Sequence, residues 1–201
     1  MNTLYTIGYT SYRIEEFVKT LQLFSIKALV DVRSLPYSSR YPEYNKENLK
    51  VLLQKNNIFY LYFGDGFGAR PDCEDCYINN EAMYSLIART SKFKEYKKRI
   101  INGLEKYNIV LLCAETDPLR CHRNILICRN IKNDFSNISH ILKNNIIEKN
   151  TESEKRLLKE YSLEQNDLFS SFEDRLESAY DMRSKEIQYK RNNASEGDFN
   201  D

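Results

Sequence analysis

Short apolar runs alternate with amphipathic stretches along the first 145 residues. β-rich apolar runs occupy residues 3–7, 28–32, 58–63 and 109–113, and apolar spacings of three and four predict helices over residues 14–21, 45–56, 81–89, 93–107 and 121–131. Strands that alternate with helices in this way favour a parallel sheet covered by helices. We therefore predict an α/β fold with three layers, a parallel or mostly parallel sheet and helices on both faces.

The pattern changes after residue 145. Two charged helices are predicted there, over residues 153–161 and 172–189, and residues 192–201 show no periodicity. We expect an α/β core domain at residues 1–145, a helical C-terminal arm packed on that core at residues 146–191, and a disordered tail at residues 192–201.

Composition fits one globular domain. The chain has 201 residues, of which 41% are hydrophobic and 29% charged. No apolar run approaches the roughly 18 residues of a membrane-spanning helix, and the start lacks the features of a signal peptide. We expect a soluble cytoplasmic protein with no membrane partner. Residues 1–150 carry a net charge of +6 and residues 151–201 one of −5, which excludes a polycation that coats nucleic acid.

Five cysteines, an odd number, indicate thiols, metal ligands or nucleophiles before disulfides in a reducing compartment. Cys73 and Cys76 have a ligand-like spacing, but no second pair has it. A zinc site of the usual four ligands is therefore not supported. We assign no metal ligands and name no cofactor from the sequence.

Polar residues follow the predicted strands at their carboxyl ends, where open parallel sheets bind ligands. The candidates for substrate binding are Gly8, Tyr9, Arg33, Ser34, Arg70 and Arg123. The candidates for catalysis are Cys113, Glu115, Cys121 and His122.

The chemistry of these residue types is consistent with catalysis on an anion. Cys121 is expected at a helix N-terminus beside a His and an Arg, which lowers a thiol pKa. His122 can transfer protons near neutral pH, Glu115 is a nearby acid or base, and arginines bind phosphate or carboxylate. The alternative for Cys113 and Cys121 is that each is a buried structural thiol.

Three segments resemble the signatures of a known family. They are TIGYT at residues 6–10, VDVRSLPYS at 30–38 and CAETDPLRCHR at 113–123, and the likeness continues through FGAR at 67–70. The chain resembles the bacterial and archaeal family called domain of unknown function 488. This resemblance implies an α/β fold, signature roles for Arg33, Cys113, Glu115, Cys121, His122 and Arg123, and an association with DNA repair. It implies no reaction.

Two further functions stay open beside an enzyme acting on a phosphate-bearing or nucleic-acid-related substrate. The segment around Arg33, followed later by a cysteine at a strand end, resembles rhodanese sulfurtransferases and related phosphatases. However, six residues separate Cys113 from Arg120, none of them Gly, and Glu115 would repel an anion in that loop. The third function is not enzymatic: QNDLF, which contains Gln165, Leu168 and Phe169, resembles the peptide with which repair proteins bind the sliding clamp.

A basic stretch offers a possible nucleic-acid surface. It holds Lys92, Lys94, Lys97, Lys98 and Arg99, with Phe93 and Tyr96 between them. Lysines three and four apart share a helix face and could contact phosphates, although a solvated helix face explains the same pattern.

Overall fold

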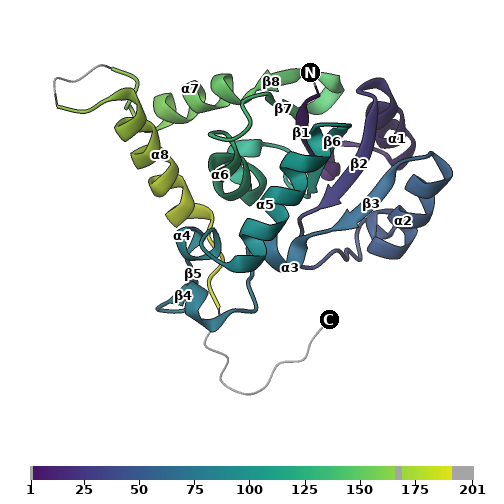
Figure 1. Ribbon diagram of the computed structural model, residues 1–201, viewed down its shortest axis with the longest axis horizontal. Coiled ribbons are helices and arrows are strands. Elements are labelled where there is room, and N and C mark those ends of the chain that lie inside the picture. Colours follow the sequence, from purple (N-terminus) through teal and green to yellow (C-terminus); the bar gives the residue numbers. More distant parts are fainter. Residues whose placement is uncertain (1, 166–168, 192–201) are drawn as a thin grey trace.

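Six strands build one sheet in the order β3-β2-β6-β1-β7-β8 (Figure 1). The structure is a computed structural model, and it describes residues 2–165 and 169–191. The strands are β1 (Leu4–Gly8), β2 (Ile26–Asp31), β3 (Phe59–Tyr62), β6 (Asn108–Cys113), β7 (Ile138–Ile141) and β8 (Ile147–Lys149). Neighbouring strands are parallel except β8, which runs antiparallel to β7. The predicted mostly parallel sheet is confirmed.

Helices cover both faces of this sheet. On one face lie α1 (Ile14–Leu23) and α2 (Lys46–Lys55), and on the other lie α5 (Ser91–Leu104) and α6 (Arg129–Ile131), as Figure 1 shows to the right and left of the strands. Leu29 and Val30, successive residues of β2, are both fully buried and belong to two different apolar clusters. Because successive strand residues point to opposite faces, a strand covered on both sides has to be apolar throughout.

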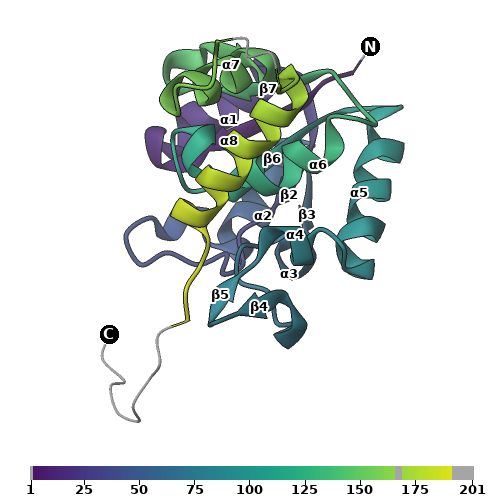
Figure 2. The same cartoon turned by 90° about the vertical axis from the view of Figure 1, so that its left-hand side faces the viewer.

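The predicted C-terminal helical arm is present as α7 (Asn150–Glu160) and α8 (Phe172–Ile187). Leu157 of α7 and Tyr180 of α8 are fully buried in the apolar cluster that also holds Leu126. Figure 2 shows α8 running across the α6 side of the molecule. The predicted tail at residues 192–201 lies outside the described residues. Within the described part of the chain, no helix is both long and apolar enough to cross a bilayer.

The connections create a crevice at the carboxyl edge of the sheet. β6 pairs with β1 on one side and with β2 on the other. The chain leaves β1 and β2 toward the face that carries α1 and α2, whereas it leaves β6 toward the face that carries α6 (Figure 1). Strands whose connections depart to opposite faces leave a ligand site at their carboxyl ends.

Two parts of the predicted pattern were wrong or missing. Residues 81–89 do not form one helix, because Asn79 and Asn80 take positive φ angles and turn the chain between β4 (Tyr77–Ile78) and β5 (Glu81–Ala82). Only α4 (Tyr84–Ile87) is helical there. The pattern also did not reveal β7, since half of its four residues are polar although all four are buried.

Candidate active site

A cleft of about 400 Å³ lies at the carboxyl edge of the sheet. The predicted site residues in its lining are Tyr9, Arg33, Ser34, Arg70, Cys113, Glu115 and His122. Their segments follow β1, β2, β3 and β6, so the sheet order brings together residues that are far apart in the sequence. The lining also contains residues that the sequence did not indicate, namely Tyr84 of α4, Ile187 at the end of α8, and Tyr189.

Arg33 is held rigidly at the cleft wall. Its Nε donates to Oδ1 of Asp31 at 2.9 Å, and its Nη2 donates to Oδ2 of Asp31 at 2.6 Å and to the carbonyl of Tyr44 at 2.8 Å. The guanidinium carbon lies 5.1 Å from the centre of the Tyr9 ring. Burial opposes the charge, but the hydrogen bonds and the charge of Asp31 outweigh it and raise the pKa of Arg33. Arg33 is thus a permanent cation.

One nitrogen of Arg33 has no partner. Nη1 is buried and makes no hydrogen bond, while the side chain as a whole is only 5% exposed. A buried donor without an acceptor is costly, and each one in a native protein calls for an explanation such as a catalytic role or a bound ion. Since Arg33 lines the cleft, its free donor indicates an acceptor, such as a phosphate or carboxylate oxygen, from a bound ligand.

Cys113, Cys121 and His122 form a compact buried cluster beside Arg33. Cys113 ends β6, whereas Cys121 and His122 precede a π-helical turn (Arg123–Cys128) that continues into α6. Nδ1 of His122 lies 3.8 Å from Sγ of Cys113 and 4.0 Å from Sγ of Cys121. The three ligand atoms lie within 4.8 Å of one another, so they could hold a metal ion. π-helical turns are rare and often occur at functional sites.

The protonation of His122 follows from its partners. Nε2 lies 2.9 Å from the carbonyl of Val32, which can only accept, so Nε2 carries a proton and Nδ1 faces the sulfurs. Burial opposes a charged imidazole, but Cys121 and Glu115 outweigh burial and raise the pKa of His122. His122 therefore carries positive charge more readily than an ordinary histidine.

A hydrogen bond joins the side chains of Cys121 and Glu115. Oε2 of Glu115 lies 2.9 Å from Sγ of Cys121. Burial raises the pKa of Cys121, but Cys113, Arg123 and His122 together lower it well below its usual value. The Glu115 side chain has an exposed edge, yet loss of hydration around its carboxyl group and the nearby sulfur raise its pKa. The carboxyl of Glu115 therefore keeps its proton to a higher pH than an ordinary glutamate does.

Gly8 and Arg123 do not line the cleft; they hold the segment that carries Glu115. A Cβ atom on Gly8 would lie 1.8 Å from the carbonyl oxygen of Glu115, so only glycine allows this approach. Arg123 is fully buried and donates to the carbonyls of Glu115 at 2.6 Å and Thr116 at 3.1 Å. Its Nε donates to Oγ1 of Thr6 at 3.2 Å. These contacts give both residues a positioning role in place of the predicted substrate contact.

Three backbone N–H groups at the end of the loop from Cys113 to Arg120 or just after it are unavailable for an anion cradle of the rhodanese or phosphatase kind. The backbone N–H of Leu119 donates to Oδ1 of Asp117, and the N–H of Arg120 donates to the Asp117 carbonyl. The N–H of Cys121 donates to Pro118. Because these N–H groups are already bonded within the loop, they cannot also surround an oxyanion.

The other predicted positions lie elsewhere. Cys73 is exposed and Cys76 buried, and neither belongs to a group of three potential metal ligands in the part of the chain that the structure describes. On α5, Lys92 pairs with Asp65 and Lys97 with Asp134. These ion pairs reduce the positive charge of the predicted nucleic-acid surface.

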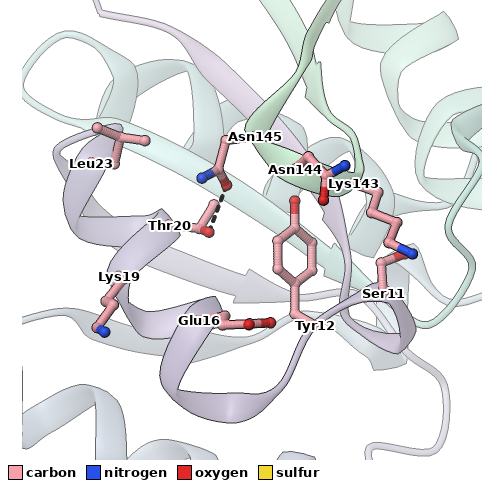
Figure 3. Close-up of a pocket in the computed structure, with 9 residues that line it drawn as sticks. All are labelled: Ser11, Tyr12, Glu16, Lys19, Thr20, Leu23, Lys143, Asn144 and Asn145. Carbon is pink, nitrogen blue, oxygen red and sulfur yellow. Dashed lines mark hydrogen bonds between the residues drawn. The ribbon is translucent and has the colours of Figure 1, made fainter.

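A second hollow of about 580 Å³ lies between α1 and the loop after β7. In Figure 3 the ring of Tyr12 stands in its centre, and a hydrogen bond joins Thr20 to Asn145. Oγ1 of Thr20 donates to Oδ1 of Asn145 at 2.7 Å. This hollow contains none of the predicted site residues.

Comparison with known proteins gave one match. Neither the curated proteins nor the solved structures yielded a relative of this chain. A family model does match residues 13–129, more than half of the chain, and that range includes the segments at 30–38, 67–70 and 113–123. The chain therefore belongs to the family described as domain of unknown function DUF488.

Proposed function

We propose that this protein is an enzyme that acts on an anionic substrate, phosphate-bearing or related to nucleic acid, in the cleft at the carboxyl edge of the sheet. The observation that carries the proposal is Arg33, a permanent cation that lines the cleft and whose buried Nη1 makes no hydrogen bond. Arg70 and Arg120, both exposed at the rim, add positive charge to the same cleft.

The reactive part of the proposal is the group formed by Cys113, Glu115, Cys121 and His122. Glu115 has a raised pKa and an edge exposed in the cleft, which suits a group that gives a proton to a substrate or takes one from it. A perturbed carboxyl next to a fixed cation in a cleft is the combination expected at a catalytic centre.

Anion binding is tested by the melting temperature. Purified protein is titrated with inorganic phosphate, nucleotides, short single-stranded oligonucleotides and dicarboxylates. A ligand at 100 times its Kd should add roughly 2.7 kcal/mol to the free energy of unfolding. Arg33→Lys keeps a cation beside Asp31 but removes the planar fork, so it should abolish the rise. Arg89→Lys, at an exposed residue outside the cleft, should retain it.

Catalysis is tested separately from binding. Any anion that raises the melting temperature is incubated with the protein, and its consumption is followed by mass spectrometry. Glu115→Gln should retain the thermal shift and lose turnover, because an amide cannot transfer the proton. Binding without turnover in the wild type would leave a binding protein in place of an enzyme, and no thermal shift with any anion would refute the proposal.

A second candidate function is docking on the sliding clamp in a DNA-repair context. It is supported by Phe169, which is 95% exposed in the connection between α7 and α8. A large apolar side chain with this exposure suits a partner's pocket. Residues 166–168 of the same peptide lie outside the described residues.

A further inference from the structure

We infer that Cys113, Cys121 and His122 bind a zinc ion that faces the cleft. This inference deepens the proposed function, on which it rests only for the role of the metal toward an anionic substrate. The spacing does not indicate this site, since a strand-end Cys followed eight residues later by adjacent Cys and His has none of the usual zinc spacings. The tertiary structure brings the three ligand atoms together.

The distances fit tetrahedral zinc coordination. With Zn–S near 2.3 Å and Zn–N near 2.0 Å, a tetrahedral site separates sulfur from nitrogen by about 3.6 Å and sulfur from sulfur by about 3.8 Å. Nδ1 of His122 lies 3.8 and 4.0 Å from the two sulfurs, and all three atoms lie within 4.8 Å of one another. The two sulfur–nitrogen distances thus lie within about half an ångström of the tetrahedral value.

Outer contacts orient the ligands as zinc sites require. A metal-binding histidine usually donates its other ring N–H to a carbonyl or carboxylate, and Nε2 of His122 donates to the Val32 carbonyl at 2.9 Å. Sγ of Cys121 accepts the backbone N–H of Arg123 at 3.5 Å. His122 thus presents Nδ1, its potential metal ligand, to the sulfurs.

The donor set selects the metal. Two thiolates and one imidazole favour zinc over magnesium or calcium, which prefer oxygen ligands. A divalent zinc ion would also neutralise two thiolates in a place where Cys113 and Cys121 are 3% and 1% exposed.

The number of ligands points to a catalytic metal. Structural zinc sites have four protein ligands, whereas catalytic sites have three and a fourth position for water or substrate. Within the described residues, the group contains three, and two of them, Cys113 and His122, line the cleft together with Arg33. An anion held by Arg33 would lie beside the metal, which could polarise a phosphoryl or carbonyl oxygen of that substrate.

Metal analysis of the full chain tests the inference. Protein expressed with zinc and purified without chelators should contain one zinc per chain by mass spectrometry of the metal. Cys113→Ser, Cys121→Ser and His122→Gln should each lose most of it. Cys128→Ser is the matched control, because Cys128 is also a buried free thiol but lies outside the cluster, and it should retain the zinc.

Cobalt substitution tests the wild type without relying on the variants. Cobalt(II) added to metal-free protein should give a sulfur-to-metal charge-transfer band and the strong visible bands of a tetrahedral site. A folded wild type with neither zinc nor this spectrum would overturn the inference, as would Cys113→Ser or Cys121→Ser with unchanged zinc content. Neither readout uses an anion. A protein without metal would therefore refute the zinc site and leave the test of anion binding at Arg33 unaffected. Likewise, a missing thermal shift would refute anion binding and leave the zinc site unaffected.

Discussion

Replacing Arg123 by Met should destabilise the fold without removing a substrate contact. Arg123 is fully buried, and its guanidinium donates to the carbonyls of Glu115 and Thr116 and to Oγ1 of Thr6. Met has a similar unbranched apolar stem, so Arg123→Met keeps much of the packing and deletes all three hydrogen bonds. The segment that carries Glu115 would then lose the hydrogen bonds that link it through Arg123 to Thr6 of β1.

The structure sets the magnitude. A hydrogen bond from a charged donor contributes roughly 1.5 to 3 kcal/mol, so three give an upper bound of roughly 9 kcal/mol. Two effects reduce this figure: Met avoids the cost of burying a guanidinium, and the carbonyls of Glu115 and Thr116 belong to exposed residues that can regain water. We expect a loss of about 3 kcal/mol, which lowers the melting temperature of a chain of this length by about 6 to 12 °C.

Urea denaturation followed by far-ultraviolet circular dichroism measures the loss. Arg120→Met is the matched control, because Arg120 is an exposed arginine three residues earlier, on the rim of the cleft. The control should lie within about 0.5 kcal/mol of the wild type. If Arg123→Met has the same urea midpoint as Arg120→Met, the positioning role is wrong; if it also loses the anion-induced thermal shift, Arg123 contacts the substrate.

Three further predictions concern pH, thiol reactivity and docking. Burial and nearby cations lower the pKa of His140 from 6.5 to about 3, so between these values the unfolded chain binds a proton that the folded chain does not. The free energy of unfolding should therefore fall on acidification through this range, by roughly 1.4 kcal/mol per pH unit from this group. The urea midpoint of His140→Asn should fall less steeply with pH than that of the wild type, and parallel curves of midpoint against pH would contradict the prediction. In metal-free protein, Cys121 should alkylate faster than Cys128, whose pKa is raised by burial, and equal slow labelling by mass spectrometry would make Cys121 a structural thiol. Replacing Leu168 and Phe169 by Ala should abolish binding to immobilised sliding clamp with little change in melting temperature, whereas a fall of many degrees and no wild-type binding would end the docking hypothesis.

Most of the fold could be predicted because its strands carry their own signal. Residues 109–113 are apolar without interruption, and β6 has both faces covered by helices. β7 escaped prediction because His140 and Ser139 interrupt its apolar run. His140 is tolerated in the core because Thr6 and Ser153 form hydrogen bonds with its two ring nitrogens. Thr6 lies far away in the sequence, and Ser153 lies in the helix that follows the sheet. The local sequence pattern around a buried polar residue does not show whether distant residues will satisfy its hydrogen bonds.

The sequence predicted the site residues only where they lie at or after the end of a predicted strand. Arg33, Cys113, Glu115 and His122 follow predicted strands, and the structure places all four on one cleft. The contribution of Tyr189 could not be foreseen, because it reaches the cleft from the C-terminal arm. Its position depends on how α8 packs, which no residue near the cleft specifies.

The sequence by itself determined which residues end the strands, because alternation and apolar runs are local properties of the chain. Only the tertiary structure decided that β6 lies between β1 and β2, which brings Cys113 beside the Val32 and Arg33 segment. The tertiary structure also gave different roles to Arg33 and Arg123, which the sequence alone does not distinguish. Arg123 donates to the carbonyls of Glu115 and Thr116, whereas Arg33, which lines the cleft, retains a buried nitrogen without a hydrogen bond. Whether a donor is satisfied depends on partners from other segments, and those partners are fixed only when the chain has packed.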